Sequence, residues 1–171
     1  LVKLITGQRG TKVVLRIKRD GRSKPFDVTI VREPIIIRTV KGWRRHSNGK
    51  WDHMLDKEAG VGYIRVTQFA DKTAGDIKRE LATLKADGAK LIILDLRFNP
   101  GGRLDSAIQI ADEFLASGPI VSTKGINSAE AGVRASSTGR GKGEFEQGEL
   151  IVLVNEQSAS ASEIVSGALQ D

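Results

Sequence analysis

Apolar and polar residues alternate near the start of the chain, at the period expected for half-buried strands. Lys12–Arg19 and Phe26–Arg32 each show this alternation, and the turn residues Asp20-Gly21-Arg22 lie between them. The pattern predicts a β-hairpin. Glu33-Pro34 follows, and proline disfavours helix before it and removes a backbone donor, so we expect a boundary here.

The segment after the boundary has a less regular pattern. Ile35–Val40 is predicted to be a strand. Gly42–Asp56 holds both tryptophans and has no clear period, which indicates a loop or irregular hairpin.

From residue 61 onward, buried strands alternate with amphipathic helices, and the order predicts an α/β domain with a mostly parallel sheet. The expected strands are Val61–Phe69, Lys90–Phe98, Ile120–Thr123 and Leu150–Val154. The expected helices are Asp71–Asp87, Arg103–Ser117 and a last one that starts near Ala159. Asn127–Gly148 is polar and glycine-rich, which predicts a hairpin or loop.

Composition limits the possible classes of protein. The 171 residues could form one large domain, or one domain and a piece of another. No apolar run approaches the length of a membrane span. The chain has no cysteine, which excludes disulfides, a thiol nucleophile and cysteine-ligated zinc. It starts at Leu1 without a signal peptide, so we expect it to begin inside a longer protein.

The positive charge is concentrated at one end. The net charge is +6, but residues 1–53 hold 14 Lys/Arg against 4 Asp/Glu. Such a segment raises nucleic acid or an anionic membrane as partners. Aromatic residues make up only 5% and no nucleic-acid motif is present, so a solvated basic surface is the preferred interpretation.

The last strand runs directly into three alternating serines, Ser158, Ser160 and Ser162. A serine between a strand and a helix suits a nucleophile, because the turn lifts the hydroxyl from the sheet and helical N–H groups stabilise an anion beside it. The alternative is structural, with Ser158 as an N-cap followed by small residues that allow close packing.

A second buried strand, Leu91–Leu96, ends in Arg97-Phe98-Asn99-Pro100-Gly101-Gly102. The carboxyl ends of parallel strands are where ligands of α/β sheets bind. Gly101 and Gly102 could there direct a backbone N–H at a developing oxyanion. Taken alone, without the serine motif, an ordinary strand-to-helix turn is the preferred interpretation.

The two motifs together, DLRFNPGG and VNEQSASASEIVSGALQD, resemble those of the carboxyl-terminal processing peptidases, or tail-specific proteases. The resemblance implies a crotonase-like α/β core and a serine endopeptidase that cleaves unstructured C-terminal tails without cofactor or metal. It implies that Ser160 is the nucleophile, and that a glycine of Gly101–Gly102 forms the oxyanion hole with the N–H of Ser160. Glu163 and Asp171 also match family positions, and both could be structural.

A serine needs a base to act as a nucleophile. A Ser–His–Asp triad would require His46 or His53 to fold back over the sheet, and two histidines without paired carboxylates make a poor metal site. The resemblance implies a Ser–Lys dyad instead, with the lysine beyond Asp171. Lys124 and Lys142 match no family position.

The hairpin near the start resembles the closing third of a PDZ domain. The expected organisation is thus a PDZ-like piece at 1–33, a linker at 34–60 and an incomplete peptidase core at 61–171. The resemblance implies the bacterial periplasm or cell envelope, with any membrane attachment through segments outside this chain. Two alternative functions remain. The first is a peptide-binding module without catalysis, and this chain alone should behave in that way. The second is a crotonase-like acyl-CoA enzyme. An acyl-CoA enzyme would explain neither the PDZ-like hairpin nor the three alternating serines.

Overall fold

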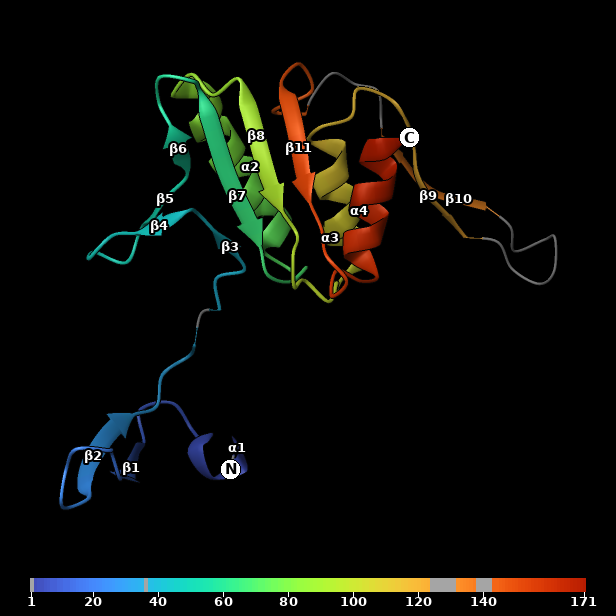
Figure 1. Ribbon diagram of the computed structural model, residues 1–171. Helices are drawn as coiled ribbons and strands as arrows, with labels where there is room; N and C mark the ends of the chain where they lie inside the picture. The colour runs from blue at the N-terminus through green and yellow to red at the C-terminus, as the bar shows by residue number, and fades with distance from the viewer. Residues whose placement is uncertain (1, 36, 124–131, 138–142) are drawn as a thin grey trace. The chain divides into compact units, whose positions relative to one another are not determined.

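A computed structural model describes residues 2–35, 37–123, 132–137 and 143–171 (Figure 1). The chain divides into two compact units, Leu1–Ile37 and Arg38–Asp171. Most of residues 34–60 lie in the second unit, and the division into a PDZ-like piece, a linker and a peptidase core stays a prediction.

The first unit contains helix α1 (Val2–Ile5) and an antiparallel pair of strands, β1 (Lys12–Ile17) and β2 (Phe26–Val31). The predicted hairpin is thus confirmed. Its strands show the expected alternation, with every second residue of β1 half-buried, but no described residue of this unit is fully buried. A hairpin of this size lacks a core of its own.

The second unit is built on a five-stranded sheet in the order β11-β8-β7-β3, with β6 also pairing to β7 (Figure 1). Strands β7 (Val61–Val66), β8 (Leu91–Asp95) and β11 (Glu149–Leu153) are parallel, as predicted. The short strands β3 (Val40–Lys41) and β6 (Met54–Asp56) add to β7 antiparallel. The strand predicted at Ile35–Val40 is only β3, because pairing to β7 starts at Val40.

A hairpin of β4 (Arg44–Arg45) and β5 (Trp51–Asp52) lies between β3 and β6. Near the other end of the unit, β9 (Gly118–Thr123) pairs with β10 (Gly132–Ser137). β9 overlaps the strand predicted at Ile120–Thr123, and of the loop or hairpin expected at 127–148 only β10 and residues 143–148 lie in the described ranges. No helix in the described ranges is long and apolar enough to cross a bilayer.

Helices α2 (Thr73–Ala86), α3 (Leu104–Asp112) and α4 (Ala161–Gln170) follow β7, β8 and β11 (Figure 1). Their apolar faces and the alternate residues of the strands form one core, which includes Ile64, Ile77, Leu81, Ile92, Leu94, Ile110 and Val165. Strand–helix alternation of this kind brings the three strand-to-helix turns to one edge of the sheet.

Helix α3 ends at Asp112, five residues before the predicted end. The reason lies in Glu113, whose carbonyl oxygen accepts from Phe145 N–H at 3.0 Å and whose carboxylate accepts from Glu144 N–H at 3.0 Å. These bonds bind the end of α3 to a distant segment, and no periodicity in the sequence records them.

Candidate active site

The turn after β8 is organised by the side chain of Asn99, which is fully buried. Its amide nitrogen donates to Val66 O at 2.9 Å, at the end of β7, and its amide oxygen accepts from Gly101 N–H at 2.9 Å. A buried amide with both groups bonded fixes the backbone around it. Asn99 therefore sets the path of the Pro100-Gly101-Gly102 turn.

The turn after β11 is hydrogen-bonded to the turn after β8. Ser158 Oγ donates to Leu96 O at 2.8 Å, and Ala159 N–H donates to Asn99 O at 3.1 Å. Asn155 Oδ1 accepts from Phe98 N–H at 2.9 Å. Two segments about 60 residues apart in sequence thus form one rigid edge.

Asn99 and Asn155 are site residues that the sequence patterns did not predict. The available signal was their position, since each is an asparagine in the first residues after a buried strand. Asparagine side chains at such points commonly bond to nearby backbone groups.

Ser160 lies between the turn and α4, and its backbone is unusual. Its φ is 55°, in the left-handed region that residues other than glycine rarely occupy. The side chain is exposed, and the residue is the N-cap of α4. The carboxylate of Glu163 accepts from Ser160 N–H at 2.6 Å, as in a capping box. Ser160 is thus held in a strained conformation at the positive end of a helix dipole.

Gly101 touches Ser160 directly. It is buried, has a φ of 98°, and a Cβ at this position would lie 2.8 Å from Ser160 Cβ and 2.7 Å from Ala159 O. A Cβ on Gly102 would collide with Phe69 O, in the bridge that joins Phe69 to Gly102. The structure therefore brings Ser160 and Gly101 together. Glycine is required at 101 by the close approach of the Ser160 segment and at 102 by the close approach of the Phe69 backbone.

The backbone donors at this point differ in their availability. Gly101 N–H is used by Asn99 and Ser160 N–H by Glu163. Among the described residues, none accepts from Gly102 N–H or Ala161 N–H. Ala161 is the first residue of α4, where N–H groups have no partner within the helix. The unoccupied donors next to Ser160 are thus Gly102 N–H and Ala161 N–H, and the oxyanion hole that the resemblance implies, a glycine of Gly101–Gly102 with Ser160 N–H, stays a prediction.

A charged cluster supports β8 just before this turn. Asp95 is fully buried and accepts from Arg97 Nε at 2.9 Å, from an Arg97 terminal nitrogen at 2.7 Å and from Tyr63 Oη at 2.5 Å. Burial acts to raise the pKa of Asp95, but the hydrogen bonds from Arg97 and Tyr63 outweigh it and hold this pKa below its usual value. Burial and the bond to Asp95 raise the pKa of Tyr63. Asp95 is therefore an ionised anchor for Arg97.

The histidines lie elsewhere. His53 Nδ1 is 3.2 Å from Tyr63 O and its Nε2 is 3.6 Å from Glu80 Oε2, beside β7 and α2. Its neighbour β6 is separated from β11 by two strands, roughly 14 Å at the usual strand spacing. His46 Nε2 lies 3.7 Å from Asp52 in the β4–β5 hairpin. Within the described ranges, no histidine or lysine hydrogen-bonds to Ser160. Lys124 and Lys142 lie outside those ranges.

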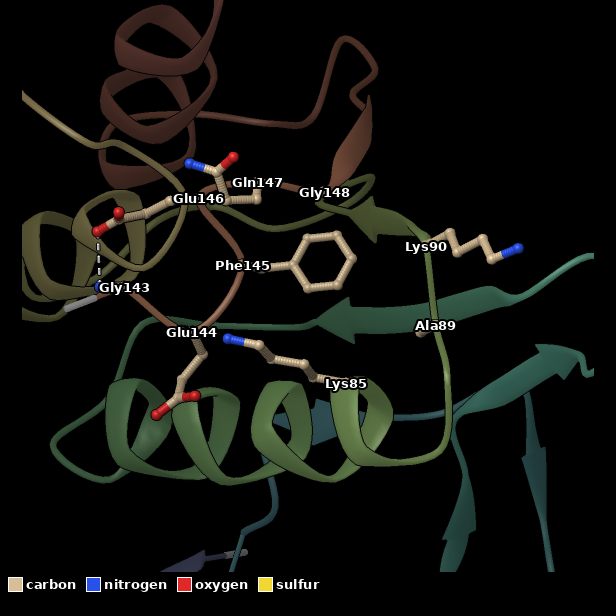
Figure 2. Close-up of a pocket in the computed structure, with 9 residues that line it drawn as sticks. All are labelled: Lys85, Ala89, Lys90, Gly143, Glu144, Phe145, Glu146, Gln147 and Gly148. Carbon is tan, nitrogen blue, oxygen red and sulfur yellow. Dashed lines mark hydrogen bonds between the residues drawn. The ribbon is translucent and has the colours of Figure 1, made fainter. Parts of the chain in front are cut away.

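A cavity of about 540 Å³ lies at the opposite edge of the sheet. It is lined by Lys85, Ala89, Lys90 and residues 143–148, next to the amino ends of β8 and β11. Figure 2 shows the ring of Phe145 inside it, with Lys85, Lys90, Glu144 and Glu146 around the sides. None of the residues that line this cavity lies in the turns that carry Gly101 and Ser160. Across the described part of the chain, no three His, Asp or Glu residues gather as metal ligands.

Comparison with known proteins gives the family. The sequence profile of peptidase family S41 matches residues 60–171, which contain the sheet strands β7, β8 and β11 and the Ser160 edge. The chain belongs to peptidase family S41.

Similar S41 proteins are bacterial. The chain is 38% identical to a carboxy-terminal-processing protease of Bartonella bacilliformis, over 99% of this chain and 36% of that protein. It is 33% identical to a Staphylococcus saprophyticus protein named "Probable CtpA-like serine protease", over 100% of this chain and 31% of that protein. The chain thus spans about a third of the length of these S41 relatives.

A solved structure shows the same fold. The photosystem II D1 C-terminal processing protease matches with a TM-score of 0.60 at 24% identity, covering 96% of this chain and 42% of that one. The mixed α/β fold with a mostly parallel sheet is thus that of S41 proteases. The family profile starts at residue 60, so the PDZ-like interpretation of residues 1–33 stays a prediction.

Proposed function

We propose that this chain carries the nucleophile of a serine endopeptidase that cleaves unstructured C-terminal tails of proteins, with Ser160 forming the acyl-enzyme. The observation that carries the proposal is the contact between Gly101 and the strained, exposed Ser160 at the amino end of α4. Family membership supports it, and so do the names of the similar proteins.

In the proposed reaction, Ser160 Oγ attacks the peptide carbonyl carbon while its proton passes to a base. The base returns this proton to the leaving amine, and water then hydrolyses the ester. We assign the developing oxyanion to Gly102 N–H and Ala161 N–H, the two donors that no described residue occupies. Gly102 N–H points away from Phe69, because it is trans to the Gly101 carbonyl that accepts from Phe69 N–H. Gly101 itself serves the close approach to Ser160.

The proposed base is a neutral lysine in the sequence that follows Asp171, forming a Ser–Lys dyad. An ordinary lysine titrates near ~10.4, so the side chain must be desolvated to act as a base around neutrality. The small, exposed residue Ala159, which directly precedes Ser160, would leave room for it. The present chain alone would then bind peptide without cutting it. The lack of a base beside Ser160 in the described ranges also keeps a purely peptide-binding role as the second candidate.

The proposed location is the bacterial cell envelope. The Bartonella and Staphylococcus relatives are bacterial, and a Streptococcus agalactiae structure with this fold carries the name lipoprotein. The proposal gives the protein no nucleic-acid partner and no cofactor.

The test is hydrolysis of an unstructured peptide by the full-length protein and its Ser160→Ala variant. We expect the variant to lose at least ~10³-fold in kcat. Ser166→Ala is the matched control, because its hydroxyl bonds only to carbonyls of its own helix, and it should keep activity. Turnover that survives Ser160→Ala would refute the proposal.

A further inference from the structure

Phe98 has an unusual backbone for an aromatic residue. Its φ is 63°, and only Ser160 shares a positive φ among the described residues other than glycine. A bulky residue in the left-handed region is a conformational outlier. Such strain persists where the surroundings fix the backbone, and it gathers at ligand contacts.

The neighbours of Phe98 do fix its backbone. Its N–H donates to Asn155 Oδ1 at 2.9 Å, and the next residue, Asn99, is held by its buried amide. The ring adds little to the packing of the fold, because the residue is 55% exposed. Asparagine or glycine could take this φ with less strain, so stability alone does not account for a phenylalanine here.

A second exposed apolar residue lies on the turn that bonds to Phe98. Val154 is 51% exposed and directly precedes Asn155, the residue that binds Phe98 N–H. Both residues follow the carboxyl ends of adjacent strands, β8 and β11. Gly101, on the same turn as Phe98, contacts Ser160. Two exposed apolar residues thus lie on the two turns that carry Gly101 and the candidate nucleophile.

We infer that Phe98, with Val154 on the turn that bonds to it, forms the surface that takes an apolar side chain of the peptide next to the scissile bond. Phe98 is then a specificity-determining residue, and its strain is the consequence of placing a ring at that point. This inference rests on the proposed function. An aromatic ring offers a large apolar contact area with few rotatable bonds to immobilise.

The experiment separates the ring from the strain in the full-length protein. Phe98→Asn removes the ring and relieves the strain, whereas Phe98→Leu keeps an apolar side chain and the strain. Leu55→Asn is the control, since Leu55 is 40% exposed in β6, away from β11. Two unstructured peptides that differ only in leucine or serine next to the scissile bond are the substrates.

We expect Phe98→Asn to lower kcat/KM for the leucine peptide about tenfold and to change the serine peptide by less than about twofold. The same variant should raise Tm by about 2–4 °C as the strain is relieved. Phe98→Leu should keep most of the preference without the rise in Tm, and Leu55→Asn should leave the preference unchanged. An undiminished preference for leucine in Phe98→Asn would overturn the inference.

Failure of the proposed function would look different. If the wild-type protein cuts neither peptide, or if Ser160→Ala still cuts them, the nucleophile assignment fails. Binding of both peptides to Ser160→Ala and to the Ser160→Ala, Phe98→Asn double variant, measured by fluorescence anisotropy, then decides on Phe98 alone. Tighter binding of the leucine peptide that Phe98→Asn abolishes supports the inference, and equal affinities in the two proteins overturn it.

Discussion

The two edges of the parallel sheet differ in how much apolar burial adds to their hydrogen bonds. At the carboxyl edge, polar side chains bond to backbone groups: Asn99 to Val66 and Gly101, and Asn155 to Phe98. At the amino edge, the segment 143–148 bonds to Glu113 and is also anchored by the buried ring of Phe145, which is 5% exposed and meets the ring of Phe114 at 6.5 Å. Both described non-glycine residues with a positive φ lie at the carboxyl edge.

The difference suggests a division of roles. Directional bonds define where a backbone donor points, whereas apolar burial mainly adds free energy of folding. Changes at the carboxyl edge should therefore affect activity more than their effect on stability suggests. Changes at the amino edge should lower the stability and leave the activity of the folded protein nearly unchanged.

The largest effect on activity is expected for Asn99→Ala. The variant leaves Val66 O and Gly101 N–H without their partner and frees the turn that touches Ser160. We expect about a 100-fold loss in kcat, the cost of misplacing a site by about 1 Å, and about 2–3 kcal/mol lower stability. The measurement is kcat for the folded full-length protein. Asn48→Ala is the control, because Asn48 makes a similar local bond to Lys50 N–H in an exposed turn. Equal kcat in both variants would remove the distinction between the edges.

Phe145→Ala should give the largest effect on stability. The ring is buried in the core, and truncation of a buried phenylalanine costs about 3–5 kcal/mol. The folded fraction should keep a kcat within about threefold of wild type, because the ring is remote from Ser160. Urea unfolding and assays below the midpoint test this, with Ile151→Ala, at a 45% exposed position, as the milder control. A large drop in kcat of the folded protein would show that the two edges are coupled.

Asp95→Asn tests the charged support of β8 through pH. The pKa of Asp95 is lower in the folded state than in the unfolded state, so the carboxylate stabilises the fold above the unfolded pKa. This contribution should begin to fade below about pH 5 and vanish as the pH falls through the folded pKa. The variant should lose about 2 kcal/mol at pH 7 and show a flatter decline in acid. The measurement is the free energy of unfolding of the wild type and of Asp95→Asn at pH 7 and pH 4. If both proteins lose the same stability between the two pH values, Asp95 is not an ionised anchor.

The smallest effect concerns the capping carboxylate. Glu163→Ala removes the acceptor of Ser160 N–H and should cost about 1 kcal/mol, while Glu163→Gln should stay within about 0.5 kcal/mol because glutamine also serves in capping boxes. Urea unfolding measures both. If the two variants lose equal stability, the charge of Glu163 matters more than its hydrogen bond.

Local patterns in the sequence identified most of the core. The helical spacing of Ile77, Leu81 and Leu84 predicted α2, and these residues are all buried. The buried runs of β7, β8 and β11 likewise predicted parallel strands, whose carboxyl ends must meet at one edge. The closeness of Ser160 and Gly101 follows from that rule alone.

What only the tertiary structure decided depends on bonds between distant residues. Strands β3 and β6 join the sheet because β7 offers a free edge, and α3 ends early because Glu113 binds residues 144 and 145. The bonds that join the Ser160 turn to the Asn99 turn, from Ala159 N–H to Asn99 O and from Ser158 Oγ to Leu96 O, belong to the same class. The sequence by itself determined which residues are apolar and where serine and glycine stand relative to the strands. The bonds that occupy Gly101 N–H and Ser160 N–H are local, with partners two and three residues away, whereas the bond from Asn99 to Val66, 33 residues apart, fixes the turn in which Gly101 lies.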